Sequence, residues 1–150
     1  MVFKSEEQLR NYILTKCKNA IAHTQEIVRQ DMIQQADAFY EDYDPIMYDR
    51  TGQLNDNGGQ SEKFIVKSPI TTIGNRCEST VYLDASALNY TTGRQPSGEQ
   101  VLTAAVGGGH GATNLRIMRG GGVSLWNPYL QEKSNSDLVK SLISQGLPLV

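Results

Sequence analysis

The chain has 150 residues, of which 39% are apolar and 20% are charged, and its formal net charge is −2. This composition is typical of a globular protein and excludes a wholly disordered chain. The net charge gives no attraction of the whole molecule to nucleic acid, and no run of Lys or Arg marks a local basic patch. We therefore expect a single domain over residues 1–150 that buries a modest core.

The sequence shows no targeting signal. Its first residues lack a basic segment followed by an apolar core, so we expect no signal peptide. No apolar run has the length of a membrane span. Cys17 and Cys77 fit neither a CxxC redox pair nor a zinc site, so we expect free thiols that pack as small apolar side chains, with a disulfide left open.

Apolar side chains recur every three or four residues between Ser5 and Tyr43, which predicts one long amphipathic helix. Ser5 and Gln8 form a capping-box pattern at its start. Such a helix would reach about 55 Å, whereas a globule of this size is about 30–35 Å wide. Part of the apolar stripe should then be covered by something other than its own domain. The stripe consists of Leu9, Tyr12, Ile13, Cys17, Ala20, Ile21, Thr24, Ile27, Val28, Met32, Ala36, Phe39 and Tyr40.

Pro45 biases Asp44 out of the helical region, which ends the long helix and predicts a short second helix at about Ile46–Leu54. The helical part of the chain is thus expected over residues 5–54.

A change to β-forming residues then predicts an antiparallel β-hairpin over residues 60–84, with a first strand at 64–66 and about ten residues a side. Pro69 indicates an edge strand or a break, and Gly74-Asn75 favours a tight turn. A lone hairpin is marginal, so it should lie against the helix or join other strands.

Residues 85–127 form the expected loop-rich part, with Gly107-Gly108-Gly109-His110-Gly111 and a second glycine run at 120–122; within it, Glu99–Val106 has the pattern of a short helix. A C-terminal helix is expected at 135–146, capped by Gly146. Its predicted buried face consists of Leu138, Val139, Leu142 and Ile143. The expected fold class is α+β: a long N-terminal amphipathic helix and a C-terminal helix packed on a small antiparallel β-sheet, with long Gly-rich loops.

The sequence offers no catalytic constellation. The glycine run around His110 lacks the Lys-Ser/Thr of a P-loop, and neither His110 nor His23 has further ligands at metal-site spacing. We therefore expect no metal, no cofactor and no enzyme activity. The alternative is a small hydrolase or nuclease that uses His110 with carboxylates near Asp44 and Asp49. Arg94, Arg116 and Arg119 fit nucleic-acid contacts or an interface that folds on assembly.

The segment Tyr48-Asp49-Arg50-Thr51-Gly52-Gln53-Leu54, after a long amphipathic helix, resembles the Y-x-R-T-G-x-L segment of a phage protein family. These are the minor structural proteins of long-tailed bacteriophages known as neck, tail-completion or head–tail joining proteins. The later order of a two-stranded section, a glycine-rich region and a C-terminal helix is similar, as are Trp126-Asn127-Pro128 and the ending 144–149. The resemblance implies structural roles for the motif residues Tyr48, Arg50, Thr51, Gly52 and Leu54.

The resemblance also implies a structural virion protein of the phage neck, assembled in the host cytoplasm, that joins the capsid connector to the tail. It would be a homo-oligomeric ring, a hexamer or a dodecamer. Its partners would be other connector, stopper and tail-tube or terminator proteins, with DNA passing through the ring without sequence-specific binding and no membrane involved. We expect subunit contacts at the overhanging end of the helix and in the arginine-bearing loops, at Leu9, Ile13, Arg94, Arg116 and Arg119.

Overall fold

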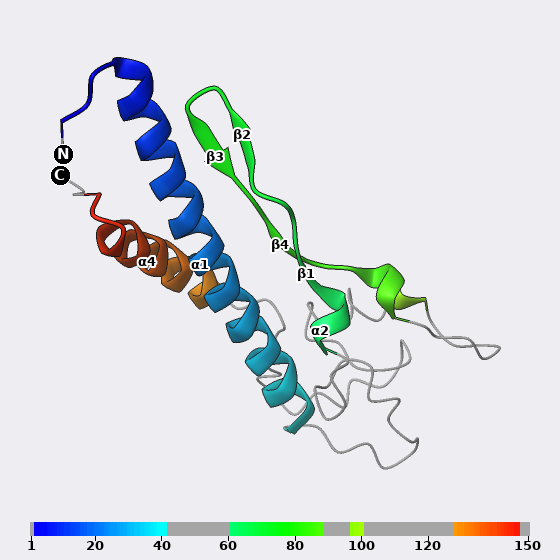
Figure 1. Ribbon diagram of the computed structural model, residues 1–150. Helices are drawn as coiled ribbons and strands as arrows, with labels where there is room; N and C mark the ends of the chain where they lie inside the picture. The colour runs from blue at the N-terminus through cyan, green and yellow to red at the C-terminus, as the bar shows by residue number, and fades with distance from the viewer. Residues whose placement is uncertain (1, 42–60, 89–96, 101–127, 148–150) are drawn as a thin grey trace, which may run out of the picture. The chain divides into compact units, whose positions relative to one another are not determined.

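The computed structural model describes residues 2–41, 61–88, 97–100 and 128–147 (Figure 1). It confirms the α+β fold class, with a long N-terminal helix, a C-terminal helix and a small set of antiparallel strands. The chain divides into two compact units. Unit 1 comprises Met1–Val28, Lys67–Val81 and Tyr129–Val150, and unit 2 comprises Arg29–Val66 and Tyr82–Pro128.

Helix α1 spans Glu6–Glu41 and confirms the predicted long helix. Its 36 residues extend about 54 Å at the rise of an α-helix. The predicted cap is present, because Ser5 Oγ accepts a hydrogen bond from the Gln8 amide at 3.2 Å. The Gln8 side chain reaches back one residue further than in a standard capping box and accepts from the Lys4 amide at 3.0 Å. The predicted short helix at 46–54 lies outside the described residues.

Strands β2 (Thr71–Ile73) and β3 (Arg76–Glu78) form an antiparallel hairpin in unit 1. Its turn is Gly74-Asn75, as predicted, and Gly74 has a φ of +61°. Among the described residues only glycines have a positive φ, so Asn75 at the second turn position has a negative φ. A positive φ at the first turn position alone is the pattern of a type II′ turn, which favours glycine there.

Strands β1 (Ile65–Lys67) and β4 (Val81–Leu83) pair in a second two-stranded sheet. The ladder of backbone hydrogen bonds is interrupted between the two sheets, next to Pro69, as the sequence predicted. There the Ser68 amide donates to the Thr80 carbonyl at 2.8 Å, while the Thr80 amide donates to Ser68 Oγ at 2.8 Å. The prediction of about ten paired residues a side was therefore wrong, since each strand has three residues.

Phe64 was wrongly predicted to begin a strand, because it ends the short helix α2 (Ser61–Phe64). Phe64 and Ile65 are 0% and 1% exposed and are the largest fully buried side chains among the described residues. Met32, Ile33, Ala36 and Leu88 are also buried in unit 2. Next to Phe64 in this unit, the Asp84 amide donates to the Phe64 carbonyl at 2.6 Å, and Asp84 caps the short 3₁₀ helix η1 (Ala85–Ala87).

Helix α4 spans Pro128–Ser144 and begins seven residues before the predicted start at 135. Pro128 occupies its first position, where a missing amide proton costs nothing because that amide has no partner in the helix. The helix ends in a Schellman motif around Gly146, whose φ is +80°. The Gly146 amide donates to the Ile143 carbonyl at 2.8 Å and the Leu147 amide to the Leu142 carbonyl at 3.1 Å. The predicted glycine cap is confirmed.

The buried face of α4 differs from the predicted one. Asp137 and Ser141 are buried, Leu138 and Leu142 are half-buried, and Val139 and Ile143 are exposed. The helix is rotated because Ser141 finds hydrogen-bond partners on α1: its Oγ lies 3.0 Å from His23 Nδ1 and 3.2 Å from Thr24 Oγ1. Residues two positions apart on a helix point to nearly opposite sides, so turning Ser141 inward leaves Val139 and Ile143 outside.

Gly98 lies close to Ala85 and Leu88 in unit 2, where there is no room for a side chain. We predict that Gly98→Ala lowers the free energy of unfolding by about 1–3 kcal/mol, the usual cost of overpacking. A Cβ there would lie 2.3 Å from the Ala85 carbonyl oxygen and 3.0 Å from Leu88 Cβ. Urea unfolding of the purified chain measures this. Glu99→Ala is the control, because Glu99 is exposed and its truncation should change the unfolding free energy by less than about 0.5 kcal/mol. Equal stability of the two variants would contradict the prediction.

Candidate assembly surface

In unit 1 the β2–β3 hairpin lies along the N-terminal part of α1, as the sequence predicted for an otherwise marginal hairpin (Figure 1). The Arg10 side chain binds the hairpin turn, with Nε donating to Asn75 Oδ1 and Nη2 donating to the Gly74 carbonyl, both at 2.8 Å. Further along, Gln25 Nε2 donates to the Ser68 carbonyl at 3.0 Å, and Glu26 forms an ion pair with Lys67. The hairpin is thus held to α1 at both of its ends by polar contacts.

The fully buried side chains in the described part of unit 1 are small or polar, and Thr24 and Ser141 meet between α1 and α4. Ala20 is fully buried beside Thr24 on α1, and Ser141 is 2% exposed on α4. Thr24 Oγ1 donates a hydrogen bond to the Ala20 carbonyl at 2.9 Å, so this buried hydroxyl has a partner within its own helix. Because apolar burial contributes about 25 cal/mol for each Å², these small side chains supply little hydrophobic stabilisation.

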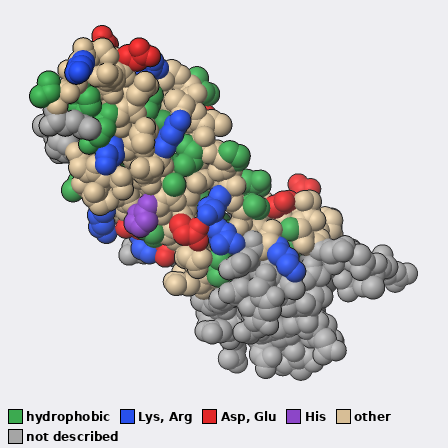
Figure 2. All heavy atoms as spheres, viewed as in Figure 1, with side chains coloured by type: hydrophobic (Ala, Val, Ile, Leu, Met, Phe, Trp, Pro, Cys, Tyr) green, Lys and Arg blue, Asp and Glu red, His purple; other side chains and the backbone are tan. Residues whose placement is uncertain are grey.

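Several large apolar side chains are exposed on the surface of unit 1. Leu9 and Ile13, one turn apart on α1, are 40% and 39% exposed. Ile73 at the hairpin tip and Val139 and Ile143 on α4 are also exposed. Figure 2 shows hydrophobic side chains among charged ones around the N-terminal end of α1. We call Leu9, Ile13, Ile73, Val139 and Ile143 the exposed apolar set.

The exposure of Leu9 and Ile13 agrees with their predicted place at the uncovered end of the stripe, and their role as subunit contacts stays a prediction. Val139 and Ile143 were missed, because the sequence pattern assigned them to the buried face of the C-terminal helix. The polar residues Asp137 and Ser141 could have corrected the predicted buried face, because both need polar partners if they face inward. On α1 such partners exist in His23 and Thr24.

Most other predicted site residues lie outside the described ranges. These are the motif residues Tyr48, Arg50, Thr51, Gly52 and Leu54, the loop arginines Arg94, Arg116 and Arg119, and the alternative catalytic set His110, Asp44 and Asp49. His23 lies within the described residues and is exposed.

Metal-binding and membrane-spanning features were searched for in the described ranges. No group of three or more His, Cys, Asp or Glu side chains there is placed to hold a metal ion. No helix in the same ranges combines the length and apolarity that crossing a bilayer requires.

Comparisons with known proteins do not identify a relative. The chain matches no protein-family model, none of the curated proteins compared with it and no solved structure.

Proposed function

We propose that this chain is a structural virion protein of a phage neck, without enzyme activity, that forms a homo-oligomeric ring joining the capsid connector to the tail. The observation that carries the assembly role is the exposed apolar set of unit 1. Exposed apolar side chains that occur singly are normal on any protein. Here they occur on α1, on the hairpin tip and on α4 of a unit whose fully buried side chains, among the described residues, are small or polar. Covering them in an assembly would add apolar burial to this unit.

The particular assembly is supported by the resemblance of the 48–54 segment and of the order of elements to neck and tail-completion proteins. A long helix followed by a hairpin and a C-terminal helix is the order that this family implies, and α1, β2–β3 and α4 follow it. Identical subunits close into rings through repeated head-to-tail contacts, which suits the proposed junction.

The proposal is tested on the purified full-length chain by mass photometry and negative-stain electron microscopy over a range of concentrations. We expect closed rings of six or twelve subunits. A chain that remains monomeric at the highest attainable concentration, in the presence and absence of DNA, would refute the ring. His110→Ala separates this proposal from the hydrolase or nuclease alternative. It should leave ring formation and the infectivity of virus carrying the variant unchanged, whereas loss of infectivity with intact rings would favour the alternative.

A further inference from the structure

The two cysteines of the chain come from α1 and β3, and both belong to unit 1. Both are free and half-buried. The contacts of Arg10 with the hairpin turn align the helix with the strand. Cys17 follows Arg10 by two helical turns, or about 10 Å, and Cys77 follows Gly74 by three strand residues, again about 10 Å. The two cysteines therefore lie at the same level along the helix–hairpin contact.

The helix presents Cys17 to the hairpin. Arg10, Cys17 and Gln25 are separated by seven and eight residues, spacings that place side chains on one helix face. Arg10 and Gln25 both donate hydrogen bonds to the hairpin or the segment that continues it. Cys17 lies between them on that face.

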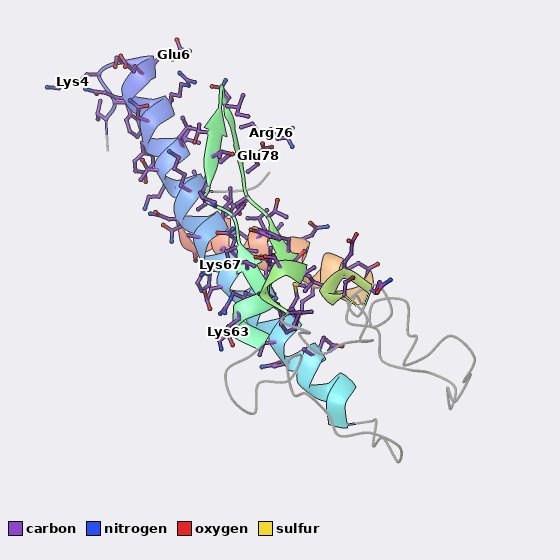
Figure 3. All side chains as sticks on the ribbon, turned by 90° about the vertical axis from the view of Figure 1, so that its right-hand side faces the viewer. Lys4, Glu6, Lys63, Lys67, Arg76 and Glu78 are labelled. Atoms are coloured by element: carbon purple, nitrogen blue, oxygen red, sulfur yellow. The ribbon has the colours of Figure 1, made fainter. Side chains whose placement is uncertain are left out.

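The hairpin presents Cys77 to the helix. Side chains alternate between the two faces of a strand, and Arg76 and Glu78, on either side of Cys77, form an exposed ion pair of 3.0 Å. Figure 3 shows this pair on the side of the hairpin away from α1. Cys77 therefore points toward α1, with its Sγ 3.7 Å from Oγ1 of its cross-strand partner Thr72.

The electrostatic environment of Cys17 agrees with this geometry. Burial, and secondarily the neighbouring Cys77, raise the pKa of the Cys17 thiol. Because the thiolate is the attacking form, the raised pKa of the Cys17 thiol lowers its reactivity toward a disulfide reagent.

We propose that Cys17 and Cys77 form a reversible intramolecular disulfide that fastens the β2–β3 hairpin to α1 when the protein meets a small-molecule disulfide such as oxidised glutathione. The Cys77 thiolate attacks one sulfur of oxidised glutathione and releases one glutathione. Cys17 then loses its proton to solvent, attacks Sγ of Cys77 and releases the second. Two protein thiols are oxidised and one glutathione disulfide is reduced to two thiols, so atoms and electrons balance. The inference does not depend on the proposed assembly role.

The test incubates the reduced full-length chain with oxidised glutathione, blocks remaining thiols, and maps peptides by mass spectrometry. We expect a monomeric product lighter by two hydrogens, in which the peptides of Cys17 and Cys77 are linked. The link should form at least about tenfold faster in the folded chain than in urea, because the fold holds the thiols together. The disulfide should raise the midpoint of thermal unfolding by about 10 °C, reversibly with dithiothreitol, since it closes a long loop.

The matched control is Cys17→Ser combined with Lys18→Cys, which keeps one thiol on the helix and turns it by about 100°. Lys18 is exposed, so this variant should stop at mixed disulfides with glutathione. Only mixed disulfides or only linked dimers from the natural chain would overturn the proposal. Equal rates of closure for the control variant, or for the natural chain in urea, would overturn it too.

Discussion

Phe64→Ala is expected to lower the free energy of unfolding by about 3–5 kcal/mol, the largest effect of any single truncation in the described residues. Phe64 is 0% exposed and lies next to Ile65 among the buried side chains of unit 2. Its removal leaves a cavity that neighbours on a helix and a short strand cannot close without moving their backbones. Since whole domains are stable by about 5–15 kcal/mol, such a loss would remove a large share of the stability.

Urea unfolding followed by circular dichroism measures this loss, at protein concentrations where the chain is monomeric. Ile73→Ala is the matched control, because Ile73 is an apolar strand residue of similar volume that is 67% exposed. Its truncation should change the unfolding free energy by less than about 0.5 kcal/mol. If Phe64→Ala cost no more than Ile73→Ala, Phe64 would not anchor unit 2.

Long-range periodicity and strong local signals made much of the fold predictable. The 3.6-residue pattern predicted α1 over the whole length that the structure describes, Glu6–Glu41. Gly74-Asn75 and Gly146 were correctly assigned, because only a residue without Cβ takes a positive φ at no cost. Pro69 marked the break between the two small sheets because it has no amide hydrogen to donate.

The errors in the predicted fold arose at residues whose placement depends on side chains that are distant in the sequence. Ile33 is buried although it lies beside the predicted stripe, which had listed Met32 and Ala36. Periodicity finds the centre of an apolar face but not its width, which depends on what packs against it. The rotation of α4 has the same origin, because the hydrogen bonds that Ser141 forms with His23 and Thr24 favour a polar inner face. Phe64 has a high strand preference, yet it ends a helical turn with its side chain in the core.

The candidate site was predictable only in part. Leu9 and Ile13 were expected to be uncovered because a helix of this length exceeds the width of a small globule, and both are exposed. The remaining apolar surface on Val139 and Ile143 depends on the rotation of α4, which the apolar pattern shared with Leu138 and Leu142 hides and which only the polar pair Asp137 and Ser141 indicates. Identification of a subunit contact also requires a partner surface, which one chain does not specify.

Ile13→Asp is expected to raise the dissociation constant of the assembled species at least about 100-fold. An unpaired charge buried at an interface costs roughly 3–5 kcal/mol, and each 1.4 kcal/mol corresponds to a tenfold change in affinity. Because every subunit of a ring carries the same substitution, each contact is weakened. In the monomer Ile13 is 39% exposed, so the new carboxylate can reach water and the unfolding free energy should fall by only about 1 kcal/mol.

Asn11→Asp is the matched control for this prediction. Asn11 is exposed, lies in the same turns of α1 as Leu9 and Ile13, and points about 160° away from both around the helix axis. It introduces the same charge change at the same distance from the N-terminus, so any general electrostatic effect on assembly appears in both variants. Mass photometry gives the assembled fraction against concentration, and urea unfolding of the monomer gives stability. Because the apolar side chain at position 13 is the proposed contact, Asn11→Asp should assemble like the natural chain while Ile13→Asp does not. If the two variants assembled equally well, or if Ile13→Asp unfolded the monomer by several kcal/mol, this end of α1 would be ordinary core and the subunit contact would lie elsewhere.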